Sequence, residues 1–440
     1  MDEVREPVLK GQPPRLSARA VRTGASPINE LMVKMFAEPD LISLAAGFVD
    51  NDTLPVETMQ TVVEALLSDV AAARAALQYG TTAGLGTLRQ QLVDRLAAAD
   101  GREVGTGGYD VERMVVGTGS QQLLYLLSEV LLDPDDIVIL SHPSYFVFMD
   151  ALRSSGVSCR AVPLDEEGMR ADRLEALLKT LAASGELSRV RFVYLVSYFQ
   201  NPTGISVSPR RRREIFDLVQ RFGADNGMLL IEDAAYRELR YDVDDVSSIR
   251  ALDEDGETVV YLGTFSKSFS PGLKTGYGLF PKTLAEHVVN LKGAHDFGSG
   301  NFAQHVLERV LRGGRYDRHV ERLRRSYRRR RDVMVQTLDE TMPAGVVRTD
   351  PQGGLYVWLT LPEGVETGAD APLFEASLAR GMLYVPGEFC FAATTAGGDV
   401  PRNCLRLSFG VGALDAIAEG VKRLAAAVRE VMDSTRTGAT

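Results

Sequence analysis

Cysteine and histidine are scarce in this chain of 440 residues, which has three cysteines and five histidines. Cys159, Cys390 and Cys404 form no CxxC pair and are too few for a disulfide framework. The histidines are scattered, so the sequence contains no recognisable metal site. These shortages argue against a disulfide-stapled secreted domain and against a zinc module, and we expect no metal.

Long apolar runs and a basic excess are also missing. No run reaches the ~20 residues that a membrane-spanning helix needs, and residues 1–20 show neither a signal peptide nor a transit peptide. The formal net charge is −10, whereas nucleic acids are bound by basic surfaces. The arginine-rich stretch 322–331 is flanked by Glu321 and Asp332 and is typical of a solvated helix face. We therefore expect a cytoplasmic protein that binds neither membranes nor nucleic acid.

The composition is that of a globular protein, with 45% hydrophobic and 25% charged residues. Because 440 residues exceed the usual size of one hydrophobic core, we expect two domains. We assign residues 51–314 to a large domain and residues 315–440 to a small C-terminal domain. Residues 1–50 form an N-terminal arm and part of the small domain in this assignment.

Short apolar runs alternate with helical segments in the middle of the chain. The runs are Met114–Val116, Ile137–Leu140, Val190–Val196, Met228–Ile231, Val259–Leu262 and Tyr277–Phe280. This alternation predicts an α/β fold with a mostly parallel sheet between helices. Ligands of such sheets bind beyond the carboxyl ends of the strands, so residues of the site should follow these runs.

The two ends of the chain follow other patterns. After a helical stretch at 284–342, the sequence predicts a smaller α+β domain with strands at 354–359, 383–385 and 404–409 and helices at 373–380 and 414–432. Near the N-terminus, a short helix at Pro27–Phe36 capped by Ser26 precedes a strand at 41–47.

Polar motifs follow four of the six central runs. Gly117-Thr118-Gly119-Ser120-Gln121-Gln122 opens a helix, so free backbone N–H groups and the Ser120 hydroxyl would face an anion such as a phosphate. Asn201-Pro202-Thr203-Gly204, then Asp233 with Tyr236, and then Lys267 follow three later runs. Singly, each motif has another explanation: a turn for the first two, a helix cap for Asp233 and an exposed loop for Lys267. Their shared position at strand ends favours one common site.

Lys267 lies among small hydroxyl residues in the stretch 263–274. A lysine amine in such a crevice suits carbonyl chemistry, most often as a Schiff base with an aldehyde cofactor. A cofactor with an aldehyde, a phosphate and a ring nitrogen also needs a carboxylate, donors for its ring oxygen and an anion cup. Lys267, Asp233, Asn201 with Tyr236, and Gly119-Ser120-Gln121 supply these groups.

The motifs GTGSQQ, HPSYF, NPTG, EDAAY, TFSKSFSPGLK and LRLSF resemble, in kind and order, those of pyridoxal-phosphate-dependent class I/II aminotransferases of fold type I. The resemblance runs from about residue 40 to the C-terminus. Two further segments, QYGTTAGLGTLR and LYVPGEFCF, are similar to the kynurenine/2-aminoadipate aminotransferase branch. The resemblance implies a homodimer that holds pyridoxal 5'-phosphate and moves the amino group of an α-amino acid to a 2-oxo acid.

The resemblance also implies roles for single residues. Lys267 would bind the cofactor and then shuttle a proton at the substrate α-carbon, Asp233 would pair with the pyridine nitrogen, and Tyr236 with Asn201 would face the ring oxygen. Tyr145 would stack on the ring, and Arg406 would clamp the substrate carboxylate beside Asn201, Gly47 and Tyr356. The phosphate would be bound by Gly119, Ser120, Gln121, Thr264, Ser266, Lys274 and, from the second subunit, Tyr79.

Two positions depart from the family pattern. Lys274 stands where the family usually has arginine; lysine keeps the charge but loses the planar two-pronged grip. Asn29 stands where the aminoadipate branch commonly has a basic residue, so we expect a distal carboxylate to be recognised poorly.

Two other functions remain open from the sequence. The same cofactor residues would support a lyase, decarboxylase or oxidase acting on an α-amino acid. The effector domain of a transcription regulator has the same fold, but that version carries a winged helix and a linker, whereas about forty residues precede the fold here.

Overall fold

The computed structural model describes residues 14–24, 31, 33, 35, 37, 38, 40–392 and 400–437. Asn29, Ser26 and most of the helix expected at 27–36 lie outside the described residues. A short helix α1 (Ala18–Arg22) is capped by Ser17, whose hydroxyl accepts from the backbone N–H of Ala20. No helix in these described ranges is long and apolar enough to cross a membrane.

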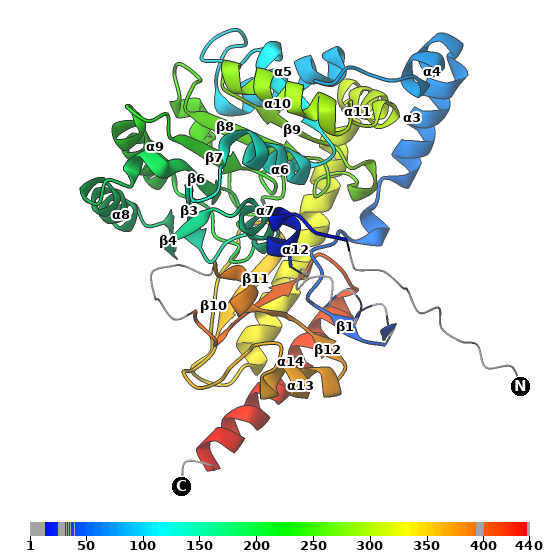
Figure 1. Ribbon diagram of the computed structural model, residues 1–440. Helices are drawn as coiled ribbons and strands as arrows, with labels where there is room; N and C mark the ends of the chain where they lie inside the picture. Colours follow the sequence, from blue (N-terminus) through cyan, green and yellow to red (C-terminus); the bar gives the residue numbers. More distant parts are fainter. Residues whose placement is uncertain are drawn as a thin grey trace, which may run out of the picture.

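An eight-stranded sheet forms the centre of the larger layered unit (Figure 1). Its order is β2 (Met114–Gly117), β9 (Gly276–Leu279), β8 (Val259–Thr264), β7 (Leu229–Asp233), β6 (Val190–Val196), β3 (Ile137–His142), β4 (Ser158–Asp165) and β5 (Gly168–Met169). Neighbouring strands from β8 to β4 are parallel, whereas β9 is antiparallel to both its neighbours and β5 to β4. The predicted α/β architecture with a mostly parallel sheet is confirmed.

Helices cover both faces of this sheet, because alternate residues of each strand point to opposite sides. On β3, Ile137 and Ile139 belong to one hydrophobic cluster and Val138 and Leu140 to the other. The helices of this unit are α3 (Val56–Ser68), α4 (Val70–Leu77), α5 (Gly86–Asp100), α6 (Ser120–Leu131), α7 (Phe146–Ser155), α8 (Ala171–Ala183), α9 (Pro209–Gly223), α10 (Lys282–His295) and α11 (Asn301–Arg312), of which α3 and α4 pack on α11. The smaller cluster lies under α8 and α9, and the larger one continues into the second layered unit.

A second, antiparallel sheet lies beyond the carboxyl ends of the central strands. Its order is β10 (Val347–Arg348), β11 (Tyr356–Thr360), β14 (Cys404–Ser408) and β13 (Val385–Pro386), and it is accompanied by α13 (Pro372–Ala379) and α14 (Leu414–Thr437). The 27-residue helix α12 (Arg315–Thr341) packs on α14 and leads from the first unit to the second (Figure 1). Near the N-terminus, β1 (Ile42–Ser43) pairs in parallel with β12 (Met382–Leu383), so this early segment joins the second unit.

Several predicted elements differ in the structure. The stretch 284–342 is three helices, because α10 ends before the segment 296–300 and Gly313-Gly314 separates α11 from α12, with Gly314 at a φ of 61°. The strand expected at 383–385 is divided between β12 and β13, which belong to different sheets. The strand expected from Gly354 begins at Tyr356, since Gly354 has a φ of 72°.

The prediction of a solvated arginine face on α12 is wrong for two of its residues. Arg330 and Arg331 are only 8% and 7% exposed. Arg330 forms an ion pair with Asp50 and Arg331 with Asp242, so each buried guanidinium has a carboxylate partner. Arg325 does lie on the exposed face, where it pairs with Glu321 one turn earlier.

Candidate active site

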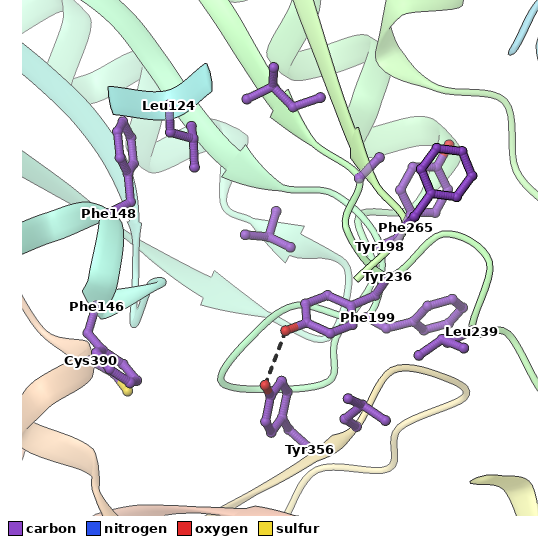
Figure 2. Packing of buried hydrophobic residues seen from close by; sticks show 14 of the residues in the cluster. Leu124, Phe146, Phe148, Tyr198, Phe199, Tyr236, Leu239, Phe265, Tyr356 and Cys390 are labelled. Atoms are coloured by element: carbon purple, nitrogen blue, oxygen red, sulfur yellow. Dashed lines mark hydrogen bonds between the residues drawn. The ribbon is translucent and has the colours of Figure 1, made fainter. Parts of the chain in front are cut away.

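The motifs after β6, β7 and β8 meet at one edge of the central sheet, facing β11 and β14. Asp233 is the last residue of β7 and pairs in register with Val196 of β6 and Leu262 of β8. Asn201 and Lys267 lie in the loops that follow β6 and β8. Figure 2 shows the buried aromatic side chains between the two sheets, with Tyr236 from one side facing Tyr356 from the other. The parallel topology thus gathers segments that are far apart in the sequence.

Asp233 is a buried carboxylate that is held by neutral donors. Its side chain accepts from the Tyr194 hydroxyl at 3.0 Å and from the backbone N–H of Ala235 at 3.1 Å. Burial raises the pKa of Asp233 from 3.8 to about 6, although both hydrogen bonds act in the opposite direction. A cationic ring N–H placed against this carboxylate would supply the counter charge that favours its ionised form.

Lys267 is half-buried in a loop with a fixed conformation. Its Nζ donates to the backbone carbonyl of Gly47 at 2.7 Å. The N–H of Phe265 donates to the carbonyl of Thr275 at 3.0 Å, and Tyr316 donates to the Ser268 hydroxyl at 2.7 Å. These contacts on both sides of Lys267 direct its amine towards the segment that follows β1.

Arg406 of β14 is 1% exposed and lies between two aromatic rings. Its Nη1 donates to Oδ1 of Asn201 at 2.8 Å and its Nη2 donates to the carbonyl of Ala45 at 2.6 Å, while its Nε has no hydrogen-bond partner. The guanidinium carbon is 4.4 Å from the ring centre of Tyr356 and 5.5 Å from that of Phe146. None of these partners is a carboxylate, so the guanidinium keeps its charge for a carboxylate ligand.

Four more predicted residues lie beside Arg406 and Asp233. The hydroxyls of Tyr236 and Tyr356 are 3.1 Å apart, and burial raises the pKa of Tyr236 well above its usual value. Burial also raises the pKa of Tyr145, which feels the charges of Asp233 and Arg406. At Gly47, a Cβ atom would stand 2.4 Å from the Tyr356 hydroxyl, so this close approach requires glycine.

The predicted phosphate cup is built around the N-terminus of α6. Gly276 of β9 pairs with Thr264 of β8 on one side and with Gly117 of β2 on the other. A Cβ atom on Gly276 would lie 2.3 Å from the backbone nitrogen of Ser120, so β9 passes directly against the start of α6. The Thr264 hydroxyl donates to Oγ of Ser266 at 3.1 Å. Free helix N–H groups and hydroxyls therefore converge here, as an anion site requires.

Other residues of the predicted cup stand in different surroundings. Gly119 precedes Ser120 with a φ of 79°, which opens the first turn of α6, and Oε1 of Gln121 is buried without a hydrogen-bond partner. Lys274 is exposed, with a φ of 47°, just after the short 3-10 turn Pro271–Leu273. Tyr79 is 82% exposed and its ring packs edge-on against Phe297 at 5.6 Å. A single chain therefore gathers most of the predicted residues but leaves Tyr79 at the surface.

Two residues that shape the site were not anticipated from the sequence. Tyr194 donates a hydrogen bond to Asp233. The sequence signal for this role is a tyrosine in the mostly apolar run Val190–Val196, because a buried tyrosine hydroxyl needs a partner. Gly276 had no comparable signal, since its role depends on the approach of α6 to β9.

The chemistry of these groups fits pyridoxal phosphate. A half-buried lysine amine suits an aldehyde, the buried Asp233 suits a protonated ring nitrogen, and the start of α6 suits a phosphate. The orphaned Gln121 oxygen and Arg406 Nε–H are polar atoms that a ligand could satisfy.

The chain is similar to known proteins over most of its length. The family model of aminotransferase class I and II matches residues 39–424. The aromatic-amino-acid aminotransferase 1 of Thermococcus litoralis is 36% identical over 94% of both chains. Among solved structures, the kynurenine aminotransferase of Pyrococcus horikoshii is 34% identical with a TM-score of 0.86, covering 94% of this chain and 97% of the other.

A third relative was solved with a derivative of the cofactor. The α-aminoadipate aminotransferase LysN of Thermus thermophilus, complexed with N-(5'-phosphopyridoxyl)-L-leucine, is 32% identical with a TM-score of 0.81, covering 95% of this chain and 98% of the other. Pyridoxal phosphate is therefore the cofactor, and the predicted transfer of an amino group is supported over the lyase, decarboxylase and oxidase alternatives. The chain belongs to the class I and II aminotransferases of fold type I.

Proposed function

We propose that this aminotransferase takes uncharged amino acids with aromatic or aliphatic side chains as donors, and that it works as a homodimer with shared sites. The observation that carries the substrate proposal is the guanidinium of Arg406, which is buried between the rings of Phe146 and Tyr356. A site of this kind offers one cation for the α-carboxylate and apolar surface for the side chain.

Arg406 binds and orients the substrate in this proposal. Its free Nε–H and its Nη groups bind the α-carboxylate, while Asn201 fixes the plane of the guanidinium from the other side. A carboxylate held at this point directs the Cα–H bond towards the amine of Lys267. A second carboxylate among the aromatic rings would cost several kcal/mol of desolvation without a cation of its own.

Lys267 and Asp233 carry the chemistry. When bound, the cofactor accepts the electron pair released when a bond at the substrate α-carbon breaks. The amine of Lys267 would hold the cofactor and would move the proton at the substrate α-carbon. Asp233 would keep a proton on the ring nitrogen, and the donors Tyr194 and Ala235 keep the carboxylate in place.

The remaining predicted residues surround the cofactor. Tyr236 and Asn201 would face its ring oxygen, Tyr145 would lie on the ring face, and Gly47 with Tyr356 would border the substrate. The phosphate is bound by Gly119, Ser120, Gln121, Thr264, Ser266 and Lys274. The convergence of Ser120, Thr264 and Ser266 around Gly276 supports this assignment.

Tyr79 completes the phosphate site of the partner subunit in the proposed dimer. Its ring and that of Phe297 are 82% and 61% exposed, and Leu77 and Val70 nearby in the chain are 70% and 61% exposed. Asn301 fixes this region by donating to the carbonyls of Ala75 and Gln78. A rigid, exposed aromatic and aliphatic surface of this kind favours contact with a second copy.

The proposal also covers the cellular location of the enzyme and the boundaries of its domains. The three cysteines are unpaired, as is usual in the reducing cytoplasm, where we expect the enzyme to act. Residues 51–314 and 315–440 form the large and small domains, with residues 1–50 as the arm and part of the small domain. The two separate sheets and the pairing of β1 with β12 support these limits.

The test of the substrate proposal is a single-turnover panel. The holoenzyme is mixed with phenylalanine, leucine, kynurenine or 2-aminoadipate, and the change in cofactor absorbance on amino transfer gives each rate. We expect 2-aminoadipate to react most slowly, and a fastest rate for it would contradict the proposal. Phenylalanine amide is the matched control, because it lacks the carboxylate that Arg406 binds and should react far more slowly than phenylalanine.

Sedimentation tests the homodimer. An active monomer at the working concentration would contradict the shared sites.

A further inference from the structure

A cavity of about 520 Å³ lies between the start of α3 and the first turns of α12. It is lined from α12 by Arg315, Arg318, His319 and Arg322, and from the other side by Asn51, Asp52, Leu54, Pro55, Val56, Glu57, Thr58 and Thr61. None of the cofactor or substrate residues of the active site borders it. The cavity is therefore separate from the active site.

Three arginines of this cavity have no carboxylate partner in the described part of the chain. Arg318 donates only to the carbonyl of Gly313 at 3.4 Å, and Arg322 donates to the carbonyl of Thr53 at 2.9 Å. Arg325 on the same helix forms an ion pair with Glu321, and the buried Arg330 forms one with Asp50. The cavity arginines thus differ from Arg325 and Arg330, because no carboxylate neutralises their charge.

The N-terminus of α3 adds further donors. This helix has 13 residues, and its N-cap position is Pro55, whose side chain makes no capping hydrogen bond. The N–H of Val56 donates to the carbonyl of Leu54, and the N–H groups that follow it in the first turn point along the helix axis with a partial positive charge. Asp52 and Glu57 also line the cavity, but neither lies within ion-pair distance of an arginine in the described ranges, and three guanidiniums with a helix end outweigh them.

His319 is the second, independent sign of a ligand. Its side chain lines the cavity and is 5% exposed, yet its Nε2 has no hydrogen-bond partner. The ring packs edge-on against Phe269 at 5.2 Å, which fixes its orientation. Burial, with a contribution from Arg322, lowers the pKa of His319 to about 4, so the ring is neutral and leaves an orphaned nitrogen beside the cationic wall.

We propose that this cavity binds a phosphate group, either as the free ion or on a small polar metabolite. In its Nε2–H tautomer the His319 ring adds one donor to the three arginines and the helix N–H groups. Together they offer more donors than the two oxygens of a carboxylate can use, whereas a phosphate presents three or four oxygens. The cavity volume exceeds that of a phosphate ion alone. Asn51, Thr58 and Thr61 line the rest of the cavity with polar side chains that an attached polar group can contact.

The test measures phosphate binding to the holoenzyme, in which the cofactor fills the cup at α6. Equilibrium dialysis with radiolabelled inorganic phosphate should show saturable binding of about one ion per chain. Arg318→Gln and the double variant Arg318→Gln/Arg322→Gln should weaken it at least tenfold. Arg325→Gln is the matched control, because it removes the same charge from the same helix outside the cavity, and it should bind as the unchanged protein does.

A second readout reports on the cavity itself. The chain has five histidines, so the His319 ring signal can be assigned in an NMR spectrum by its loss in His319→Phe. Phosphate should shift this signal with the same dissociation constant as in dialysis, and glycerol phosphate should do so more strongly if a phosphorylated metabolite is the natural ligand. Absence of saturable binding, or equal binding by Arg318→Gln/Arg322→Gln and Arg325→Gln proteins of unchanged thermal stability, would overturn the proposal.

Discussion

Replacement of Asp233 by asparagine should stabilise the cofactor-free protein at neutral and alkaline pH. The native carboxyl has a pKa of about 6 against 3.8 for its ordinary value, so the folded state holds its proton more tightly than the unfolded state. The contribution of this carboxyl to the free energy of unfolding is therefore fully present below the unfolded pKa, and it is lost as the pH rises through about 6. Since a tenfold change in proton affinity corresponds to about 1.4 kcal/mol, the total loss is about 3 kcal/mol.

Asparagine is close to the carboxylate in shape and can keep both contacts. Its amide oxygen can accept from the N–H of Ala235, and its amide N–H can donate to the oxygen of Tyr194. Because the asparagine side chain does not ionise, the variant does not lose free energy of unfolding as the pH rises. The difference in free energy of unfolding between variant and wild type should grow by about 1.5 kcal/mol between pH 5 and pH 8, since part of the total is already lost at pH 5.

Urea unfolding of both proteins without cofactor, at one-unit intervals from pH 5 to pH 8, measures this difference. Asp225→Asn is the control, because Asp225 is exposed and has the same charge to lose. If the difference in free energy of unfolding between the variant and wild type stays constant from pH 5 to pH 8, Asp233 ionises in the folded protein as easily as in the unfolded chain, and the reasoning is wrong. In the holoenzyme the same variant should lose most of its turnover, since an amide cannot stabilise a positive ring nitrogen.

Three further outcomes are expected. Lys267→Ala should abolish turnover while keeping part of the cofactor through the phosphate cup, and wild-type turnover would refute the assignment of the lysine. Gly47→Ala should raise KM for the amino acid several-fold, because its Cβ would lie 2.4 Å from the Tyr356 hydroxyl; steady-state kinetics with the double variant Gly47→Ala/Tyr356→Phe, which removes that hydroxyl, should recover part of the loss. Mixing Tyr79→Phe with Lys267→Ala protein should give more activity than either alone, since hybrid dimers with shared sites contain one intact site; no gain after verified subunit exchange would place Tyr79 in the site of its own chain.

The parts of the site that depend on strand order could be predicted from the sequence. Lys267, Asp233 and the Gly119-Ser120 turn could be found because each follows a short apolar run, and parallel strands bring their carboxyl ends to one edge. These features are local, since a run of apolar residues and the polar group after it are neighbours in the chain. The α/β fold class followed from the same alternation.

Only the folded chain shows how distant side chains complete the site. Arg406 bonds to Asn201 across 205 positions of sequence, and Gly47 must be glycine only because Tyr356 of the second sheet approaches it. Along α12 the sequence shows a dense row of arginines, but their surroundings divide them into buried ion pairs, exposed helix pairs and the unpaired cluster around His319. The charge of each residue is written in the sequence, whereas its partner and its contact with water are set by which elements pack beside it.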